Sequence, residues 1–140
     1  MLQRVKDVMT MPVETVGPDD TLQKAAMLMS DRDVGPLPVV EDNVVVGILT
    51  DRDITIRAVA AGCDPTRTMV RQAMSRDLVC CQADEDLESA VQRMEEAEVR
   101  RLPVIDRDRN LVGMVALADV ARNADEKTTA QAVRGVSQPS

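Results

Sequence analysis

The stretch Gly-Ile-Leu-Thr-Asp-Arg-Asp at positions 47–53 carries most of the information about this fold. It follows the β-type run 44–46 and precedes residues 54–61, whose apolar spacing predicts a helix of about two turns. Threonine and aspartate at such a junction commonly cap the helix, because their side chains accept from unpaired first-turn amides. The same junction can hold a phosphate and a ribose. Capping and ligand binding are therefore both open for Thr50 and Asp53.

The neighbourhood of this stretch occurs twice. Residues 34–41 (VGPLPVVE) and 46–54 (VGILTDRDI) reappear as residues 99–106 (VRRLPVID) and 112–120 (VGMVALADV). Farther upstream, Met9-Thr10 corresponds to Met74-Ser75. An internal repeat of this length indicates two copies of one supersecondary unit, neither of which can bury its apolar face alone.

These motifs together resemble the cystathionine-β-synthase (CBS) domain, and their tandem arrangement resembles a stand-alone CBS pair. The resemblance covers residues 4–122. It implies an α+β fold in which two pseudo-symmetric β-α-β-β-α motifs pack sheet to sheet. The expected divisions are residues 1–62 for the first motif, 63–73 for a linker, 74–123 for the second motif and 124–140 for a partly helical tail.

The local patterns predict the elements of each copy. Residues 13–16 alternate like a strand, and Asp19 and Asp20 supply caps for a helix that ends at Arg32. Its predicted buried face consists of Leu22, Ala25, Ala26 and Met29. Residues 37–40 and 44–49 form a predicted hairpin. The second copy has a strand at 78–81, a helix at 84–97 and a hairpin turn at 107–110, and a short helix is predicted at 130–136.

The resemblance also implies nucleotide-binding residues by motif position. The motif threonine approaches phosphate, the aspartate accepts from the ribose, and apolar first-strand residues hold the base. The implied first cleft consists of Thr50, Arg52, Asp53, Val79, Cys80, Cys81, Arg100 and Arg101. The implied second cleft has Asp119, Thr15 and Val16. We expect it to be weaker, because Ala116 replaces the hydroxyl.

Two alternatives stay open for the arginines. Arg100 and Arg101 could balance the glutamates of the preceding helix, which are Glu95, Glu96 and Glu98. Arg52 could screen Asp51 and Asp53 or reach a phosphate.

Composition limits the partners and the compartment. The chain has 17 basic and 24 acidic residues and a net charge of −7, which opposes nucleic-acid binding. It has no aromatic residue, so a bound base would lie between aliphatic side chains. No apolar stretch is long enough for a signal peptide or a membrane span, which predicts a cytoplasmic protein without a membrane partner. Without histidine, the three cysteines (Cys63, Cys80 and Cys81) predict reduced structural thiols and no metal site.

The expected function is regulatory. No combination of nucleophile and base is recognisable, so we expect no catalytic residues, no enzyme activity and no required cofactor. The leading hypothesis is a homodimeric module that senses AMP, ADP, ATP, NAD or S-adenosylmethionine and acts on a separate, unidentified protein. The alternative is a dimerising interaction module without a small ligand.

Overall fold

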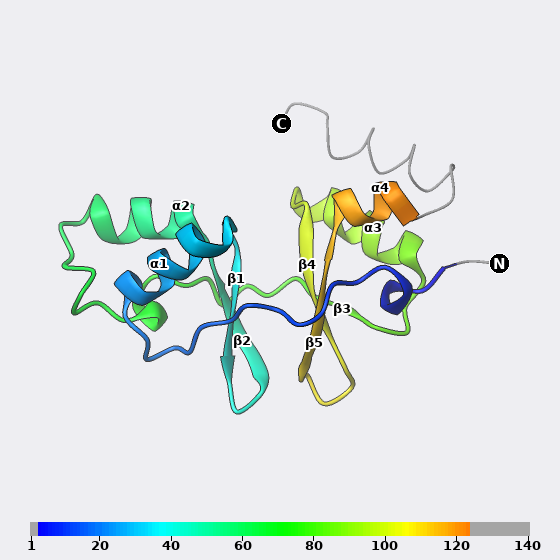
Figure 1. The fold of residues 1–140 in the computed structure, drawn as a ribbon, viewed down its shortest axis with the longest axis horizontal. Helices are drawn as coiled ribbons and strands as arrows, with labels where there is room; N and C mark the ends of the chain where they lie inside the picture. Colours follow the sequence, from blue (N-terminus) through cyan, green and yellow to red (C-terminus); the bar gives the residue numbers. More distant parts are fainter. Residues whose placement is uncertain (1–2, 124–140) are drawn as a thin grey trace. The chain divides into compact units, whose positions relative to one another are not determined.

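The structure is a computed structural model that describes residues 3–123 (Figure 1). The predicted tail at 124–140, with its helix at 130–136, lies outside the described residues. Two compact units are present, and each mixes the two sequence repeats. The central unit is continuous over residues 14–78. The terminal unit joins residues 3–13 to residues 79–123.

The central unit contains one hairpin and helices around it. Its elements are α1 (Leu22–Arg32), β1 (Leu37–Glu41), β2 (Val44–Leu49), α2 (Asp51–Asp53), a π-helical segment (Ile54–Val59) and a 3-10 turn (Val70–Gln72). β1 and β2 are antiparallel. Asp42 and Asn43 at the turn have φ of 52° and 67°, as a tight two-residue hairpin turn requires. The predicted hairpin is confirmed.

The predicted strand at 13–16 is reduced to one bridge. Val16 pairs in parallel with Val39 of β1. The Val16 amide donates to the Pro38 oxygen at 3.2 Å, and the Val40 amide donates to the Val16 oxygen at 2.9 Å. The strand prediction was therefore wrong in extent, because Gly17 and Pro18 follow at once and end the extended pairing.

Helix α1 ends at Arg32 as predicted, but its cap is Thr21 and neither Asp19 nor Asp20. The Thr21 hydroxyl accepts from the Lys24 amide at 3.2 Å. Asp20 instead accepts from the Gly17 amide at 2.7 Å, and this bond is the main cause that lowers the Asp20 pKa below its usual value. The aspartate thus stabilises the turn before the helix.

The buried face of α1 differs from the prediction at one residue. Leu22, Ala25 and Met29 are buried, whereas Ala26 is exposed. Leu28 is half-buried and packs against the same core. The buried face of α1 therefore includes part of Leu28 in place of the predicted Ala26.

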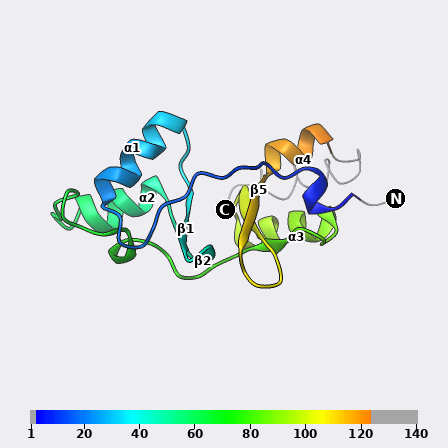
Figure 2. The ribbon, with the colours of Figure 1, turned by 60° about the horizontal axis from the view of Figure 1, so that its bottom comes forward.

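The terminal unit contains a three-stranded sheet. Its elements are a 3-10 turn (Val5–Asp7), β3 (Cys81–Gln82), α3 (Leu87–Ala97), β4 (Arg101–Ile105), β5 (Leu111–Ala116) and α4 (Leu117–Asn123). The strand order is β3-β4-β5, with β3 parallel to β4 and β4 antiparallel to β5. Helix α3 begins after Asp86, later than the predicted position 84. Figure 2 shows the N-terminal segment beside β5, where Thr10 pairs with Met114.

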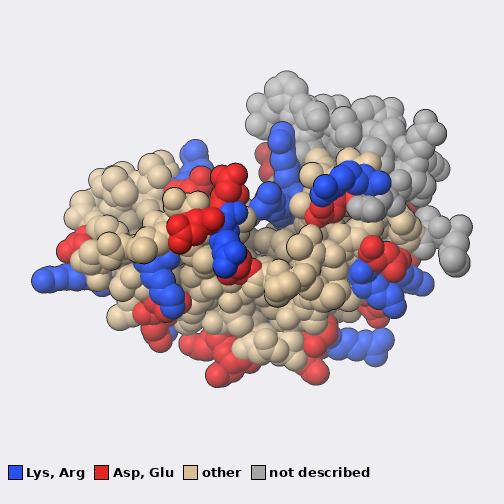
Figure 3. Space-filling model, viewed as in Figure 1, with Lys and Arg blue, Asp and Glu red and all other residues tan. Residues whose placement is uncertain are grey.

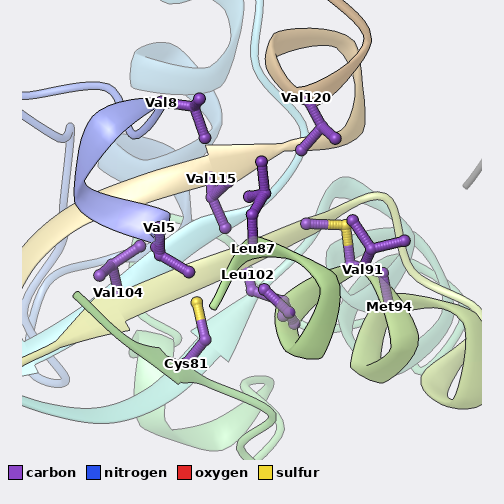
Figure 4. Packing of buried hydrophobic residues seen from close by; sticks show 11 residues of the cluster. Val5, Val8, Cys81, Leu87, Val91, Met94, Leu102, Val104, Val115 and Val120 are labelled. Atoms are coloured by element: carbon purple, nitrogen blue, oxygen red, sulfur yellow. The ribbon is translucent and has the colours of Figure 1, made fainter. Parts of the chain in front are cut away.

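Each unit has its own aliphatic core. The terminal core, shown in Figure 4, includes Val5, Val8, Cys81, Leu87, Val91, Met94, Leu102, Val104, Val115 and Val120. The central core includes Val70 and Ala73, two residues of the predicted linker. The first residues of each repeat therefore complete the core of the unit that holds the other repeat's hairpin.

Candidate ligand site

Thr50 and Asp53 form a reciprocal cap at the end of β2. The Thr50 amide donates to Asp53 Oδ2 at 2.9 Å, and the Asp53 amide donates to Thr50 Oγ1 at 3.1 Å. This capping box satisfies two groups at the helix start. The capping interpretation is thus confirmed. Asp53 Oδ1 accepts no hydrogen bond from residues 3–123, so the same carboxylate keeps an oxygen for a ligand.

The residues between Thr50 and Asp53 are exposed. Within the described chain, Arg52 makes no ion pair with Asp51 or Asp53, so the structure does not show the screening alternative. Asp51 lies against Gly35, where an added Cβ would come within 3.1 Å of Asp51 Oδ1. The small residue ahead of β1 therefore leaves room for the carboxylate.

The helix after Asp53 is π-helical instead of the regular helix predicted at 54–61. The Ala60 amide donates to the Thr55 oxygen at 3.0 Å, an i to i+5 bond. Arg57 Nη1 donates to the carbonyls of Ala73 at 3.3 Å and Met74 at 3.1 Å. These bonds attach the helix to the segment that follows the 3-10 turn.

The other central-unit candidates offer little side-chain surface. Thr15 is half-buried, and Val16 is buried in the core. Val16 therefore offers almost no surface to a ligand, and its amide and carbonyl already pair with Pro38 and Val40.

The cysteine candidates belong to the terminal unit. Cys81 is buried, and its thiol donates to the Pro103 carbonyl at 3.8 Å. Burial is the main cause that raises the Cys81 pKa to about 12. Cys80 and Val79 are half-buried, and burial also raises the Cys80 pKa. Cys80 and Val79 thus offer side-chain surface that Cys81 does not.

These environments predict graded thiol reactivity. A thiol reagent at pH 8 should modify the exposed Cys63 first, Cys80 slowly and Cys81 only after unfolding, because the thiolate is the reactive form. Mass spectrometry of peptides from native and urea-treated protein measures the order. Equal native labelling of Cys63 and Cys81 would contradict this burial pattern.

Arg100 and Arg101 are exposed at the start of β4. The Arg100 carbonyl accepts from the Leu117 amide at 2.8 Å. Neither guanidinium pairs with Glu95, Glu96 or Glu98 in the described chain, so no ion pair supports the balancing alternative. Both side chains are available to an anion.

Asp119 occupies the position equivalent to Asp53 but has different partners. Thr10 Oγ1 donates to Asp119 Oδ2 at 3.3 Å, and Arg122 pairs with Asp119 Oδ1. Ala116, at the Thr50 position, supplies no hydroxyl. The sequence analysis missed Thr10, although the match of Met9-Thr10 to Met74-Ser75 placed it in the repeat.

On the face drawn in Figure 3, Lys and Arg side chains lie among Asp and Glu side chains. Across residues 3–123, no three or more His, Cys, Asp or Glu side chains group as a metal site. None of the helices described has the length and apolar character to cross a membrane.

A family model for the CBS domain matches residues 5–59 and 70–126. The chain belongs to the CBS domain family. CBS pairs are regulatory ligand-binding modules, and the family model that matches this chain describes the CBS domain and not a catalytic domain. The α+β prediction is confirmed, since solved CBS pairs share this fold.

Three proteins illustrate the similarity. The CBS domain-containing protein YhcV of Bacillus subtilis is 48% identical over 122 residues, 87% of this chain and 86% of YhcV. Hypoxic response protein 1 of Mycobacterium tuberculosis is 38% identical over 96% of this chain and 94% of its own. The CBS pair of MJ0100, solved with 5′-methylthioadenosine and S-adenosyl-L-methionine, has a TM-score of 0.75 and 25% identity, covering 87% of this chain and 95% of that one.

Proposed function

We propose that this CBS pair binds an adenine nucleotide or a related adenosyl compound at the Thr50–Asp53 junction and thereby regulates a separate protein. The observation that carries the proposal is the open Oδ1 of Asp53, held in place by the capping box. A carboxylate fixed in this way can accept from ribose hydroxyls without losing its structural hydrogen bond. The adenosyl ligands of MJ0100 support this ligand class.

By their motif positions in a CBS pair, the proposed phosphate contacts are Thr50 and Arg52 of the central unit and Arg100 and Arg101 of the terminal unit. All three arginines are exposed and have no carboxylate partner in the described chain. The Thr50 hydroxyl accepts from the Asp53 amide and keeps its proton for donation. Val79 and Cys80 are proposed contacts for the base. No metal or organic cofactor is part of this proposal.

A thermal-shift series tests ligand binding directly. We expect at least one of AMP, ADP, ATP, NAD or S-adenosylmethionine to raise the unfolding temperature, because a ligand that binds only the folded state stabilises it by about 2.7 kcal/mol at 100 times its Kd. CMP serves as the control for a nucleotide without adenine. No shift with any adenosyl compound at millimolar concentration would favour the ligand-free interaction module.

A second arm separates phosphate contact from general stability. Replacing Arg100 and Arg101 by alanine should weaken AMP binding and leave adenosine binding unchanged, since adenosine has no phosphate. Equal losses for both ligands would contradict a phosphate role.

We also propose that the chain forms a homodimer. Ile56 and Val59 lie on one helix with 54% and 64% of their surface exposed, and a symmetric dimer would bury this apolar surface. Light scattering at micromolar concentration should give twice the chain mass, and Ile56→Asp with Val59→Asp should give the chain mass. A wild-type monomer would contradict the dimer.

A cytoplasmic location fits the free thiols, because that compartment keeps cysteines reduced.

A further inference from the structure

The two equivalent aspartates have different hydrogen-bond partners. Asp53 and Asp119 are both the third residue of the helix that follows the second hairpin strand. Asp53 uses Oδ2 to cap Thr50 and leaves Oδ1 open among residues 3–123. Asp119 has a partner on each oxygen, because Thr10 Oγ1 donates to Oδ2 and Arg122 pairs with Oδ1.

Main-chain pairing fixes Thr10 beside Asp119. The Thr10 amide donates to the Met114 oxygen at 2.8 Å, and the Met114 amide donates to the Thr10 oxygen at 3.1 Å. This pairing places Thr10 beside Met114 of β5, two residues before the strand ends at Ala116. Helix α4 begins at the next residue. Arg122 reaches the same carboxylate from the next turn of α4. The Asp119 side chain is only 18% exposed, whereas that of Arg122 is 73% exposed.

In the central unit the main chain makes the same pairing, but the side chains make different hydrogen bonds. Ser75, the counterpart of Thr10, exchanges two hydrogen bonds with Ile48 at 2.9 and 3.0 Å. Its hydroxyl accepts from the Asp77 amide at 3.3 Å and makes no hydrogen bond with Asp53. At this main-chain pairing, the hydrogen bonds of the side chains therefore differ between the two units.

We propose that Thr10 and Arg122 hold Asp119 as an internal tie between the N-terminal segment and α4, which leaves Asp53 as the ribose acceptor of this chain. The stoichiometric part rests on the proposed function. A ribose hydroxyl adds a hydrogen bond at Asp53, whereas at Asp119 it has to displace one. Thr10 and Arg122 are thus positioning residues that determine which repeat binds.

Calorimetry tests the stoichiometry. Titration of wild-type protein with AMP, and separately with S-adenosylmethionine, should show one strong site per chain. The variant Thr10→Val/Ala116→Thr/Arg122→Gln removes these two partners of Asp119 and restores the hydroxyl at position 116, so it should show a second site. Valine keeps the β-branched shape of Thr10 and its main-chain pairing. A folded triple variant that still binds at one site, or a wild type with two equal sites, would overturn the proposal.

A double-mutant cycle tests the tie without a ligand. Thr10→Val and Asp119→Ala should each lower the unfolding temperature by about 2–4 °C. The double variant should lose less than the sum, because each change removes the same hydrogen bond between Thr10 and Asp119. The matched control is Ser75→Ala with Asp53→Ala, which should be additive. Additive losses at Thr10 and Asp119 would disprove the tie. Absence of any binding by the wild type would refute the proposed function and leave this cycle to decide the tie.

Discussion

Replacing Asp53 by alanine is expected to weaken binding of the adenosyl ligand by about 10- to 100-fold. The substitution removes the charged acceptor of the ribose hydroxyls, and a hydrogen bond to a charged group contributes about 1.5–3 kcal/mol. Each 1.4 kcal/mol or so changes Kd tenfold. Asp119→Ala should change Kd little, because Thr10 and Arg122 already occupy that carboxylate. Calorimetry on both variants measures the difference.

The matched control for this experiment is Asp53→Asn. Asparagine keeps a side-chain oxygen that can accept from the Thr50 amide, so the capping box is preserved while the charge is lost. Its stability should lie close to that of the wild type, whereas Asp53→Ala should lose about 1 kcal/mol of folding stability through the missing cap. An Asp119→Ala loss of affinity larger than that of Asp53→Ala would show that the repeats have the opposite roles.

The sequence predicted the elements whose signals are local. Asp42 and Asn43 tolerate positive φ and lie between two β-type runs, so the hairpin could be placed from its turn. The end of α1 at Arg32 was likewise correct. The cap of α1 was not, because Thr21 and Asp20 are both good capping residues and only the Gly17 contact of Asp20 distinguishes them.

The sequence could not predict how the chain segments combine into units. Met9 packs on Gly113 and Met74 packs on Gly47, contacts that no local periodicity encodes. The repeat revealed that these residues correspond, but not which hairpin each methionine covers. The same limit applies to Thr10, whose role depends on its place beside Met114. The repeat and the resemblance to CBS domains therefore identified the motif aspartates and left their partners to the three-dimensional structure.

Replacing Gly47 by alanine is expected to lower the free energy of unfolding by about 1–3 kcal/mol, the usual cost of overpacking. A Cβ at this position would lie 2.8 Å from Met74 Sδ and 2.9 Å from the Ser75 carbonyl oxygen. The sulfur can move, but the carbonyl is held by the Ile48 amide at 3.0 Å. Urea denaturation measures the loss. Gly17→Ala is the control, since its nearest contact would be an ordinary 3.5 Å, and it should change stability by less than about 0.5 kcal/mol.

The equivalent substitution Gly113→Ala tests which neighbour causes the clash. Its Cβ would lie 2.7 Å from Met9 Sδ but 3.2 Å from the Thr10 oxygen, so most of the conflict is with a flexible side chain. Replacing Met9 by alanine should therefore recover much of the stability that Gly113→Ala loses. Replacing Met74 by alanine should recover less of the stability that Gly47→Ala loses, because the main-chain oxygen stays in place. Two double-mutant cycles compare these coupling energies. Equal recovery of stability in both units would mean that the methionine side chain, and not the main chain, causes the destabilisation at Gly47.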